Sequence, residues 1–368
     1  MQLPSLQLGD TVARLPIIQG GMGVGISLSR LASAVANEGG IGVIAAAMIG
    51  MNEPDVGKKP LEANLRALRN EIQKAKSMTQ GILGVNIMVA LTNFSDMVRA
   101  SIKEGIDVVF SGAGLPLELP KLRPEGSHTK LAPIVSSARA ASIICRKWLS
   151  RYNVLPDLVV VEGPKAGGHL GFKAEQLDSP AFAIEKLVPE VVEAVAPFES
   201  EAGRPIPVIA AGGVYSGEDI CRMLTLGASG VQMGTRFVGT HECDADQAFK
   251  ESYIRAEEKD VIVIKSPVGM PGRAIDNEFL EQVRQGKTHP KACPFKCLVT
   301  CDPEKSPYCI AKALLNAKKG KLSHGFAFAG ANAFRVKAIV SVKEVFASLR
   351  EEFDRACASL EPVGTAAG

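Results

Sequence analysis

Short apolar runs alternate with longer amphipathic stretches along most of the chain, and the apolar runs typically end in Gly, Ser, Asn or Glu. Short continuous apolar runs are typical of strands buried on both faces, and the stretches between them have the spacing of crossover helices. The pattern predicts eight parallel strands, at Leu15–Gln19, Ile41–Ala46, Ile82–Val89, Val108–Ser111, Ala132–Ser136, Leu158–Glu162, Pro207–Ala211 and Gly230–Gly234.

The amphipathic stretches predict helices that return the chain from one strand to the next. Three of these helices end alike, with a glycine just before the next strand, at Gly39, Gly105 and Gly227. A repeated helix, glycine stop and apolar strand predicts a (β/α)8 TIM barrel. An open doubly wound sheet is the alternative, because strand order is not visible in a sequence. The predicted helices are Ser27–Asn37, Leu61–Ser77, Ser95–Glu104, Ala138–Tyr152, Ala181–Val195 and Ser216–Leu226.

The regular alternation stops after about residue 260. A strand-like run at Val261–Lys265, a Gly/Pro turn and a cysteine-rich segment follow, and helical patterns return at Ile310–Lys319 and Val342–Arg355. A barrel needs only about 250 residues, whereas the chain has 368. We therefore predict a barrel at 1–258 and a C-terminal addition at 259–368, with the cysteine segment at 293–309 and the terminal helices packed on the barrel.

Composition narrows the class of protein. The chain is 46% hydrophobic and 22% charged, which suits a large core, and its formal charge of +3 suggests no basic surface for a nucleic acid. The longest uncharged apolar stretch, around Ile41–Met51, is shorter than the ~18 residues that span a bilayer. No secretory leader pattern is present, so we expect a cytoplasmic protein with reduced thiols, no membrane contact and a small-molecule substrate.

The exits of the last two predicted strands are rich in glycine. The seventh leaves through Gly212 and Gly213, and the eighth through Gly234 and Thr235. Glycines let backbone N–H groups approach a phosphate, the following helix start adds a positive dipole, and the Thr235 hydroxyl can donate a further hydrogen bond. These loops predict a phosphate site at the usual place in a barrel. Arg236 follows, but an arginine there can equally pair with a carboxylate elsewhere.

The first and third strands also end in residues suited to a flat heterocycle. Gly20 and Gly21 would let a ring lie against the backbone, Met22 offers a soft apolar contact, and the Asn86 amide can both donate and accept hydrogen bonds. An isolated asparagine at a strand end often has only a structural role. The prediction that Asn86 contacts a heterocycle therefore depends on the glycine-rich loops predicted beside it.

The sixth strand leads into a glycine loop that runs from Glu162 through Gly167 and Gly168 to His169. A histidine held among glycines at the catalytic rim is suited to general acid or base work, or to binding a substrate anion. The other histidines form no metal-ligand spacing and are expected on the surface or in loops: His128, His241, His289 and His324.

These motifs together resemble the nitronate monooxygenase family, formerly the 2-nitropropane dioxygenases, which also contains flavin-dependent enoyl-acyl carrier protein reductases. The resemblance runs through Pro16–Met22, Gly84–Asn86, Glu162–His169 and Gly212 to Arg236. It implies non-covalent FMN and places His169 at the active site as catalytic base or substrate-binding group. One departure is Lys165, where the family usually has an acidic residue. The implied contacts of FMN are Met22, Asn86, Gly212, Gly213, Gly234 and Thr235.

The family implies two kinds of flavin chemistry. One is oxidation of an alkyl nitronate or nitroalkane, with oxygen as acceptor, and this is the leading hypothesis. The other is reduction of an enoyl thioester, with electrons from NAD(P)H or from a ferredoxin-like donor. A flavin-free phosphate-binding barrel of the inosine monophosphate dehydrogenase type is a further alternative, although no predicted strand exit carries the cysteine nucleophile that it needs.

Four of the eight cysteines lie in one short segment, with the spacing C-x3-C-x3-C-x7-C. Dense thiols in a reducing compartment usually bind metal. Zinc sites generally show C-x2-C pairs, so this spacing favours an iron–sulfur cluster, and zinc is less favoured. The alternative is a set of thiols on the apolar face of a helix, and a non-catalytic electron-transfer subunit would rest on this segment alone. The four are Cys293, Cys297, Cys301 and Cys309; Cys145, Cys221, Cys243 and Cys357 are expected to be buried small residues.

Overall fold

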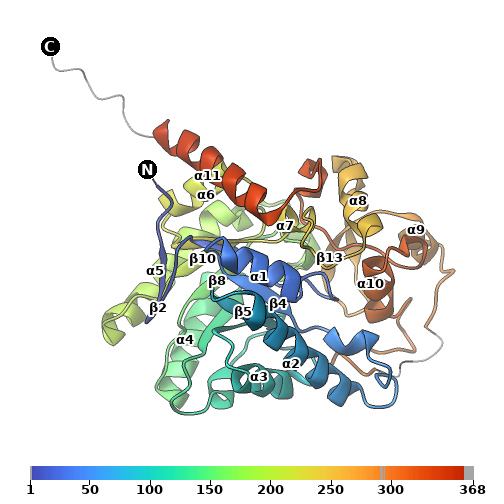
Figure 1. Cartoon of the computed structure of the whole chain (residues 1–368), viewed down its shortest axis with the longest axis horizontal. Coiled ribbons are helices and arrows are strands. Elements are labelled where there is room, and N and C mark those ends of the chain that lie inside the picture. Colours follow the sequence, from blue (N-terminus) through green and yellow to red (C-terminus); the bar gives the residue numbers. More distant parts are fainter. Residues whose placement is uncertain (1, 291–292, 294, 360–368) are drawn as a thin grey trace.

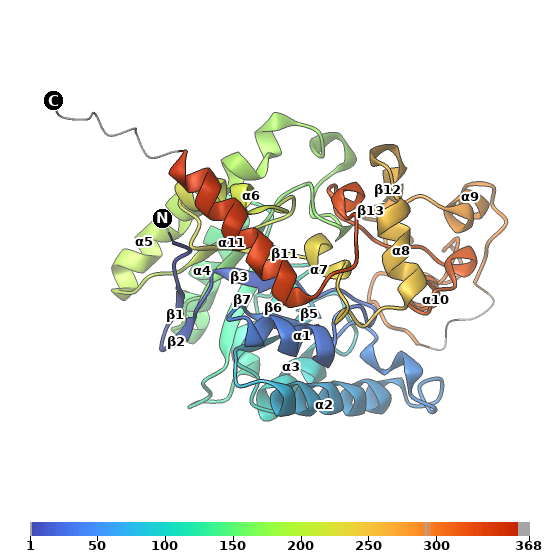
Figure 2. The same ribbon diagram turned by 45° about the horizontal axis from the view of Figure 1, so that its top comes forward.

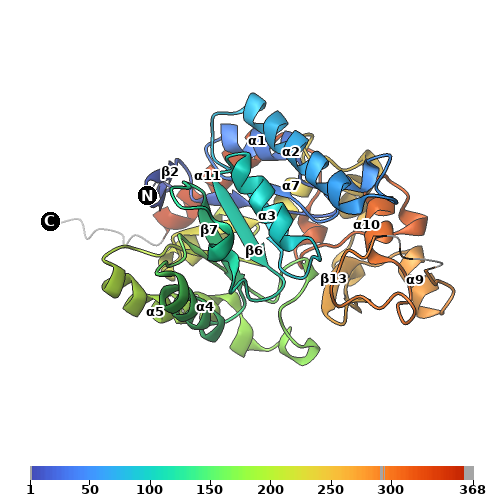
Figure 3. The same cartoon turned by 90° about the horizontal axis from the view of Figure 1, so that it is seen from below.

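Eight parallel strands close into a barrel in the computed structural model, which describes residues 2–290, 293 and 295–359 (Figure 1, Figure 3). Neighbours pair in the order β3-β11-β10-β8-β7-β6-β5-β4, and a parallel bridge between Ile18 and Ile41 joins β3 to the start of β4. The TIM barrel and all eight predicted strands are confirmed, and the open sheet is wrong. The strands are β3 (Ile17–Gln19), β4 (Gly42–Ala45), β5 (Leu83–Met88), β6 (Val108–Gly112), β7 (Lys130–Val135), β8 (Val159–Glu162), β10 (Val208–Ala211) and β11 (Gly230–Met233).

Helices surround the barrel and follow its strands, as the sequence predicts (Figure 2). The ends differ by a few residues, most in α5, which continues through Pro189 and Pro197 to a left-handed Gly203. The helices of the barrel are α1 (Ser29–Asn37), α2 (Pro60–Met78), α3 (Phe94–Lys103), α4 (Ala138–Tyr152), α5 (Ile184–Ala202), α6 (Gly217–Thr225), α7 (Thr235–Val238) and α8 (Gln247–Arg255). Single 3-10 turns lie at Ile49–Asn52, Leu119–Leu122, Ala174–Gln176, Pro180–Phe182, Glu258–Asp260, Leu322–His324 and Ala333–Arg335. Among the described residues, no helix is long and apolar enough to cross a membrane.

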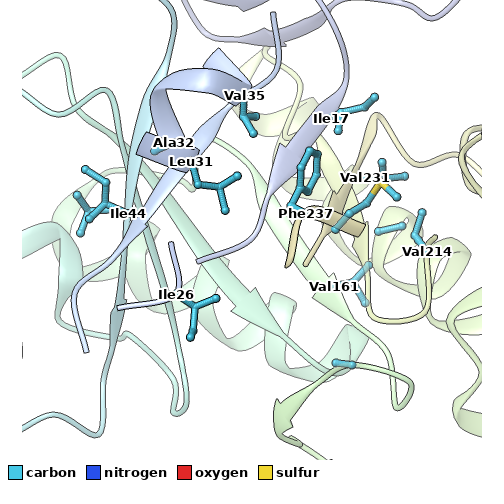
Figure 4. Close-up of a cluster of buried hydrophobic side chains, with 14 of the residues drawn as sticks. Ile17, Ile26, Leu31, Ala32, Val35, Ile44, Val161, Val214, Val231 and Phe237 are labelled. Atoms are coloured by element: carbon cyan, nitrogen blue, oxygen red, sulfur yellow. The ribbon is translucent and has the colours of Figure 1, made fainter. Parts of the chain in front are cut away.

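The apolar core has two layers, because alternate residues of each strand face inward and outward. The inner layer includes Ile18, Val160 and Phe110. A short hairpin of β1 (Leu6–Leu8) and β2 (Thr11–Ala13), which the sequence pattern did not predict, adds its apolar side chains to this layer. Figure 4 shows part of the outer layer, where Ile17 and Val231 of the strands meet helix residues such as Leu31 and Val35.

Much of the chain after residue 260 lies together at one side of the barrel, whereas the last helix lies across the barrel's own helices (Figure 1). Strands β12 (Val261–Lys265) and β13 (Pro271–Ile275) pair antiparallel, and β13 also pairs with β9 (Gly168–His169), which belongs to the loop after β8. The last helix, α11 (Val342–Ala358), packs against α6 and α1. The segment is thus tied to the barrel, and the boundary at residue 258 stays a prediction. The remaining helices are α9 (Glu278–Arg284) and α10 (Ile310–Lys318).

The cysteines differ from expectation in two respects. Cys221 of α6 and Cys357 of α11 form a disulfide, so the expectation of separate reduced thiols is wrong for this pair. The two residues are 136 positions apart, and only the packing of α11 on α6 brings them together. Cys145 and Cys243 are free and buried, as expected.

Candidate active site

A cavity of about 520 Å³ opens at the carboxyl ends of the strands. This volume lies within the ~300–1,000 Å³ that small-molecule and cofactor sites occupy. Every residue that the sequence predicted for flavin binding or catalysis lines this cavity, and the structure therefore brings all of them together. They are Gly20, Gly21, Met22, Asn86, Glu162, Gly167, Gly168, His169, Gly212, Gly213, Gly234 and Thr235.

The loops after β10 and β11 line the cavity with glycines. Gly212 and Gly213 have φ of +82° and +109°, in the left-handed region that favours glycine. Among the described residues, the N–H groups of Gly212, Gly213 and Gly234 donate no backbone hydrogen bond. The half-buried Thr235 follows at the start of α7. Unused donors at the mouth of a barrel form a cradle suited to an anion.

The start of α6 does not take part in this cradle, contrary to the expectation from sequence. The N–H of Gly217 donates to the Glu352 carboxylate at 2.7 Å, and the N–H groups of Tyr215 and Ser216 donate to Asp219. Because carboxylates of the protein already satisfy these donors, the positive end of α6 is occupied. Arg236 belongs to the same arrangement, with its guanidinium 3.4 Å from Glu352, so its alternative role as a carboxylate partner is confirmed.

Close packing at the first and third strand exits explains the glycine at position 21. A Cβ atom on Gly21 would lie 2.3 Å from the Cβ of Asn86, which is far too close for two non-bonded carbon atoms. Met22 reaches across toward β11, where its sulfur would lie 3.4 Å from a Cβ on Gly234. Position 21 therefore requires glycine beside the Cβ of Asn86, and the two residues form part of the cavity wall.

His169 is held from two sides by residues of the C-terminal segment. Its Nε2 lies 2.7 Å from the Ser266 hydroxyl oxygen, and its ring packs edge-on against Phe328 with centroids 5.0 Å apart. Burial lowers the pKa of His169 from 6.5 to about 4. The imidazole is therefore neutral at physiological pH, with one ring nitrogen carrying a proton.

Glu162, the last residue of β8, faces the same cavity. Burial raises the pKa of its carboxyl from 4.5 to about 7. No hydrogen bond of its side chain is found within the described part of the chain, which leaves desolvation as the dominant influence. Near neutral pH this carboxyl is therefore protonated in part of the molecules and ionised in the rest.

A buried arginine of β13 holds the loop that carries His169 by hydrogen bonds. Arg273 donates to the carbonyl oxygens of Pro164 and Ala166, at 2.5 and 2.8 Å. Charge-assisted bonds to two carbonyls are stronger than bonds between neutral groups. Arg273 therefore fixes the loop between β8 and β9, on which the exposed Lys165 also lies.

One wall of the cavity was not predicted from the sequence, and it consists of Phe328, Ala329, Gly330 and Asn332. The side-chain amide of Asn332 donates a hydrogen bond to the carbonyl oxygen of Gly213 at 2.7 Å. The backbone N–H of Ala331 donates to the carbonyl oxygen of Lys165 at 3.0 Å. The apolar residues that end at Gly330 have the same pattern as the barrel's strand exits. This similarity is the sequence pattern from which the wall could have been predicted.

The remaining predicted residues lie outside the cavity or at its edge. The other four histidines lie on the surface or in loops, as expected: His128, His241, His289 and His324. Cys297 lines the cavity with Leu298, whereas Cys293, Cys301 and Cys309 do not. The described residues from Cys293 to Cys301 form no helix, so the alternative of three thiols on one helical face is wrong. Among the residues that the structure describes, no group of three or more His, Cys, Asp or Glu is arranged to hold a metal ion.

Comparison with known proteins agrees with this geometry. The family model for nitronate monooxygenase matches residues 7–352. A probable nitronate monooxygenase of Staphylococcus saprophyticus is 27% identical over 308 residues, which are 77% of this chain and 82% of that protein. The (3aS,4S,5R,7aS)-5-hydroxy-7a-methyl-1-oxo-octahydro-1H-indene-4-carboxyl-CoA dehydrogenase of Mycobacterium tuberculosis is 32% identical over 271 residues, which are 74% of this chain and 66% of that protein.

Solved structures extend the similarity to nearly the whole chain. FabK from Thermotoga maritima has a TM-score of 0.72 and 28% identity, over 94% of both chains. Nitroalkane oxidase from Streptomyces ansochromogenes has a TM-score of 0.71 over 94% of this chain and 97% of its own, but at 23% identity it supports the fold alone. The match of the family model over most of the chain, joined to a barrel whose predicted site residues meet in one cavity, shows that this chain belongs to the nitronate monooxygenase family of FMN-dependent oxidoreductases.

Proposed function

We propose that the cavity holds FMN, with its phosphate on the N–H groups of Gly212, Gly213 and Gly234 and on the Thr235 hydroxyl. The observation that carries this assignment is the set of unused backbone donors at adjoining strand exits. Gly20, Gly21, Met22 and Asn86 would then lie against the flavin ring, with Glu162, Gly167 and Gly168 at its edge. When bound, FMN supplies two-electron redox chemistry, and the protein supplies orientation and polarity.

The chemistry at the substrate end follows from the neutral state of His169. A pKa of about 4 makes its imidazole a weak base, which is poorly suited to removing a proton from carbon. If the Ser266 hydroxyl donates to Nε2, the proton of the ring lies on Nδ1, and that N–H can donate to a substrate oxyanion. A neutral histidine acts as an electrophile of this kind in triosephosphate isomerase. An alkyl nitronate, which has already lost its proton, presents such an oxyanion.

We therefore propose that the enzyme oxidises alkyl nitronates, with His169 as the group that binds their oxygens. The test is steady-state oxygen consumption with ethyl nitronate by wild type and by His169→Ala, after release and quantification of the flavin. We expect one FMN per chain in both proteins and a loss of about 10²-fold in kcat/KM for the variant, the lower range for a positioned hydrogen-bond donor. Equal activity at equal flavin content would remove His169 from this role.

A second candidate is reduction of a conjugated thioester, and Lys165 is the observation that favours it. This exposed residue is at the cavity rim, and its side chain packs against the Gly213 loop, within 3.0 Å of where a Cβ on Gly213 would lie. A lysine there can attract the phosphates of a coenzyme A or acyl carrier protein thioester. The relative from Mycobacterium tuberculosis is named for a carboxyl-CoA substrate.

Crotonyl-CoA with NADH or NADPH tests this second activity. If it operates, Lys165→Glu should raise KM for crotonyl-CoA at least tenfold and change KM for the uncharged butenone much less. A KM for crotonyl-CoA that does not change would exclude Lys165 as a thioester contact.

The electron donor for a reductase is either NAD(P)H or a small acidic protein of the ferredoxin class. The distribution of charge favours the protein donor. Residues 285–321 contain eight lysines and two acidic residues, so the positive charge is less evenly spread than the overall composition suggests. Lys305 and Lys312 are exposed beside the cysteines. Opposite charges steer such partners together, so reduction by ferredoxin should slow steeply as salt rises.

A further inference from the structure

The chain after β12 lines the cavity almost entirely with apolar side chains. Of the described residues after β12 that line it, Asn332 alone carries an amide, hydroxyl or charged side chain. The strand exits of the barrel, in contrast, contribute polar side chains such as Asn86, Glu162 and Thr235. We call the following lining residues the apolar wall: Val24, Met48, Leu91, Leu298, Ile310 and Leu314.

The residues of the apolar wall lie together in space, although they come from distant parts of the sequence. Val24 and Met48 belong to one buried cluster, and Leu298 and Leu314 pack against it. The same two leucines also pack against the neighbouring cluster, which contains Ile310. The wall therefore runs without interruption from the loops after β3 and β4 to helix α10.

The part of the wall that precedes α10 is fixed to the loop after β5. The N–H of Thr92 donates to the carbonyl oxygen of Cys297 at 3.2 Å, and an antiparallel bridge joins Leu91 to Leu298. Burial raises the pKa of the Cys297 thiol to about 12, so this thiol is protonated and contributes an apolar surface to the cavity. This side of the cavity is thus both held in place and uncharged.

The apolar wall continues to the histidine at the rim. The ring of His169 packs edge-on against Phe328, and Phe328 packs edge-on against Phe326, with centroids 5.0 Å apart in both pairs. Phe326 belongs to the same buried cluster as Ile310 of the wall. A ligand whose charged end meets His169 therefore has an apolar surface available to the rest of its length.

We propose that the apolar wall binds the hydrocarbon part of the substrate, so that the enzyme prefers nitronates with long alkyl chains to short ones. The inference rests on the proposed function, in which His169 binds the nitronate oxygens. Apolar surface removed from water favours binding by up to about fourfold for each methylene group. Met48 of the wall has a φ of +52°, in the left-handed region that residues with a Cβ seldom adopt, and such strained positions cluster at ligand sites.

The experiment measures the binding of saturated carboxylates to the full chain loaded with FMN, by isothermal titration calorimetry. A carboxylate is a planar anion with two oxygens, like a nitronate, but the enzyme has no route to oxidise it. Octanoate should bind at least about 20-fold more tightly than butyrate, which is well below the limit for four added methylene groups. In the same way, kcat/KM for hexyl nitronate should exceed that for ethyl nitronate.

Two neighbouring leucines of α10 give a matched pair of variants. Leu314→Ala removes a side chain of the wall and should weaken octanoate binding at least about fivefold, with a change of less than about twofold for butyrate. Leu315→Ala is the control, because Leu315 is also half-buried and packs against the same cluster but does not line the cavity. It should leave the Kd of both carboxylates unchanged, and circular dichroism of both variants checks their fold.

The outcomes separate the wall from the proposed activity. Octanoate that fails to bind, or that binds no more tightly than butyrate, would overturn the wall, as would equal effects of the two variants. Weaker FMN binding by Leu314→Ala with an unchanged ratio of the two carboxylate Kd values would assign these residues to the flavin instead. Preference for octanoate in a protein that oxidises no nitronate would support the wall and contradict the proposed function.

Discussion

The side-chain amide of Asn332 donates a hydrogen bond to the backbone carbonyl of Gly213 at 2.7 Å, so a residue near the end of the chain holds the loop after β10. Asn332→Ala should leave this loop less well ordered and weaken FMN binding about tenfold, the effect of a hydrogen bond worth about 1.4 kcal/mol. Titration of flavin-free protein with FMN, followed by fluorescence, measures this change. Asn316→Ala is the matched control, because Asn316 makes the same kind of bond to His324. Equal losses in both variants would contradict a specific role for Asn332.

Gly21→Ala should disrupt the wall formed with Asn86. The added Cβ would lie 2.3 Å from the Asn86 Cβ, so one of the two strand exits must move. Overpacking of this kind costs about 1–3 kcal/mol, and we expect lower flavin content and a lower free energy of unfolding in urea. Gly57→Ala is the control, since nothing lies within 4 Å of a Cβ there. Normal flavin content in Gly21→Ala would show that the FMN ring does not need this wall.

The buried His169 should make stability fall as the pH is lowered. Its pKa is about 4 in the folded chain, against 6.5 for an exposed histidine, so the unfolded chain binds more protons between these pH values. The free energy of unfolding should therefore decrease from pH 6.5 toward pH 4, by at most about 3 kcal/mol. His169→Asn should lose this dependence in urea titrations at closely spaced pH values. A slope that is the same in wild type and variant would contradict the burial effect.

Glu162 should produce the opposite dependence. Its carboxyl has a pKa of about 7 in the folded chain, against 4.5 ordinarily, so the folded chain binds more protons between these values. Its contribution to stability is therefore present below pH 4.5 and is lost as the pH rises through 7. Glu162→Gln keeps the shape of the side chain and cannot ionise, so the variant should be more stable than wild type at pH 8 and similar at pH 4.5. Greater instability of the variant at pH 8 would show that the ionised carboxylate has a partner.

The Cys221–Cys357 disulfide should stabilise the chain against unfolding. It closes a long loop of 136 residues between α6 and α11, and such cross-links typically contribute about 2–4 kcal/mol. The double variant Cys221→Ala/Cys357→Ala should unfold at lower urea concentration, and a reducing agent should destabilise wild type but not the variant. Mass spectrometry under denaturing conditions, with and without reduction, checks the bond itself. If mass spectrometry finds two free thiols at these positions, the disulfide and its expected contribution to stability are both contradicted.

The barrel was predictable because each of its strands is an apolar run that ends in a distinctive residue. The same reasoning located Gly212, Asn86 and His169, since the carboxyl ends of parallel strands meet at one rim. It failed where pairing is short or distant in sequence. Strand β9 has only two residues, and β1 and β2 have three each, too few to establish a period. The disulfide and the capping of α6 by Glu352 depend on how α11 packs, which no local pattern encodes.

Because β9 pairs with β13, the proposed active site is built from residues of two separate parts of the sequence. The residues proposed to hold FMN come from the barrel, whereas Ser266, Phe328 and Arg273, which position His169, come from the segment that follows it. Mutations in that later segment can therefore alter which substrates the enzyme accepts while the residues proposed to hold its cofactor stay the same. A barrel cut off before β12 would keep those residues and lose the partners that aim its histidine.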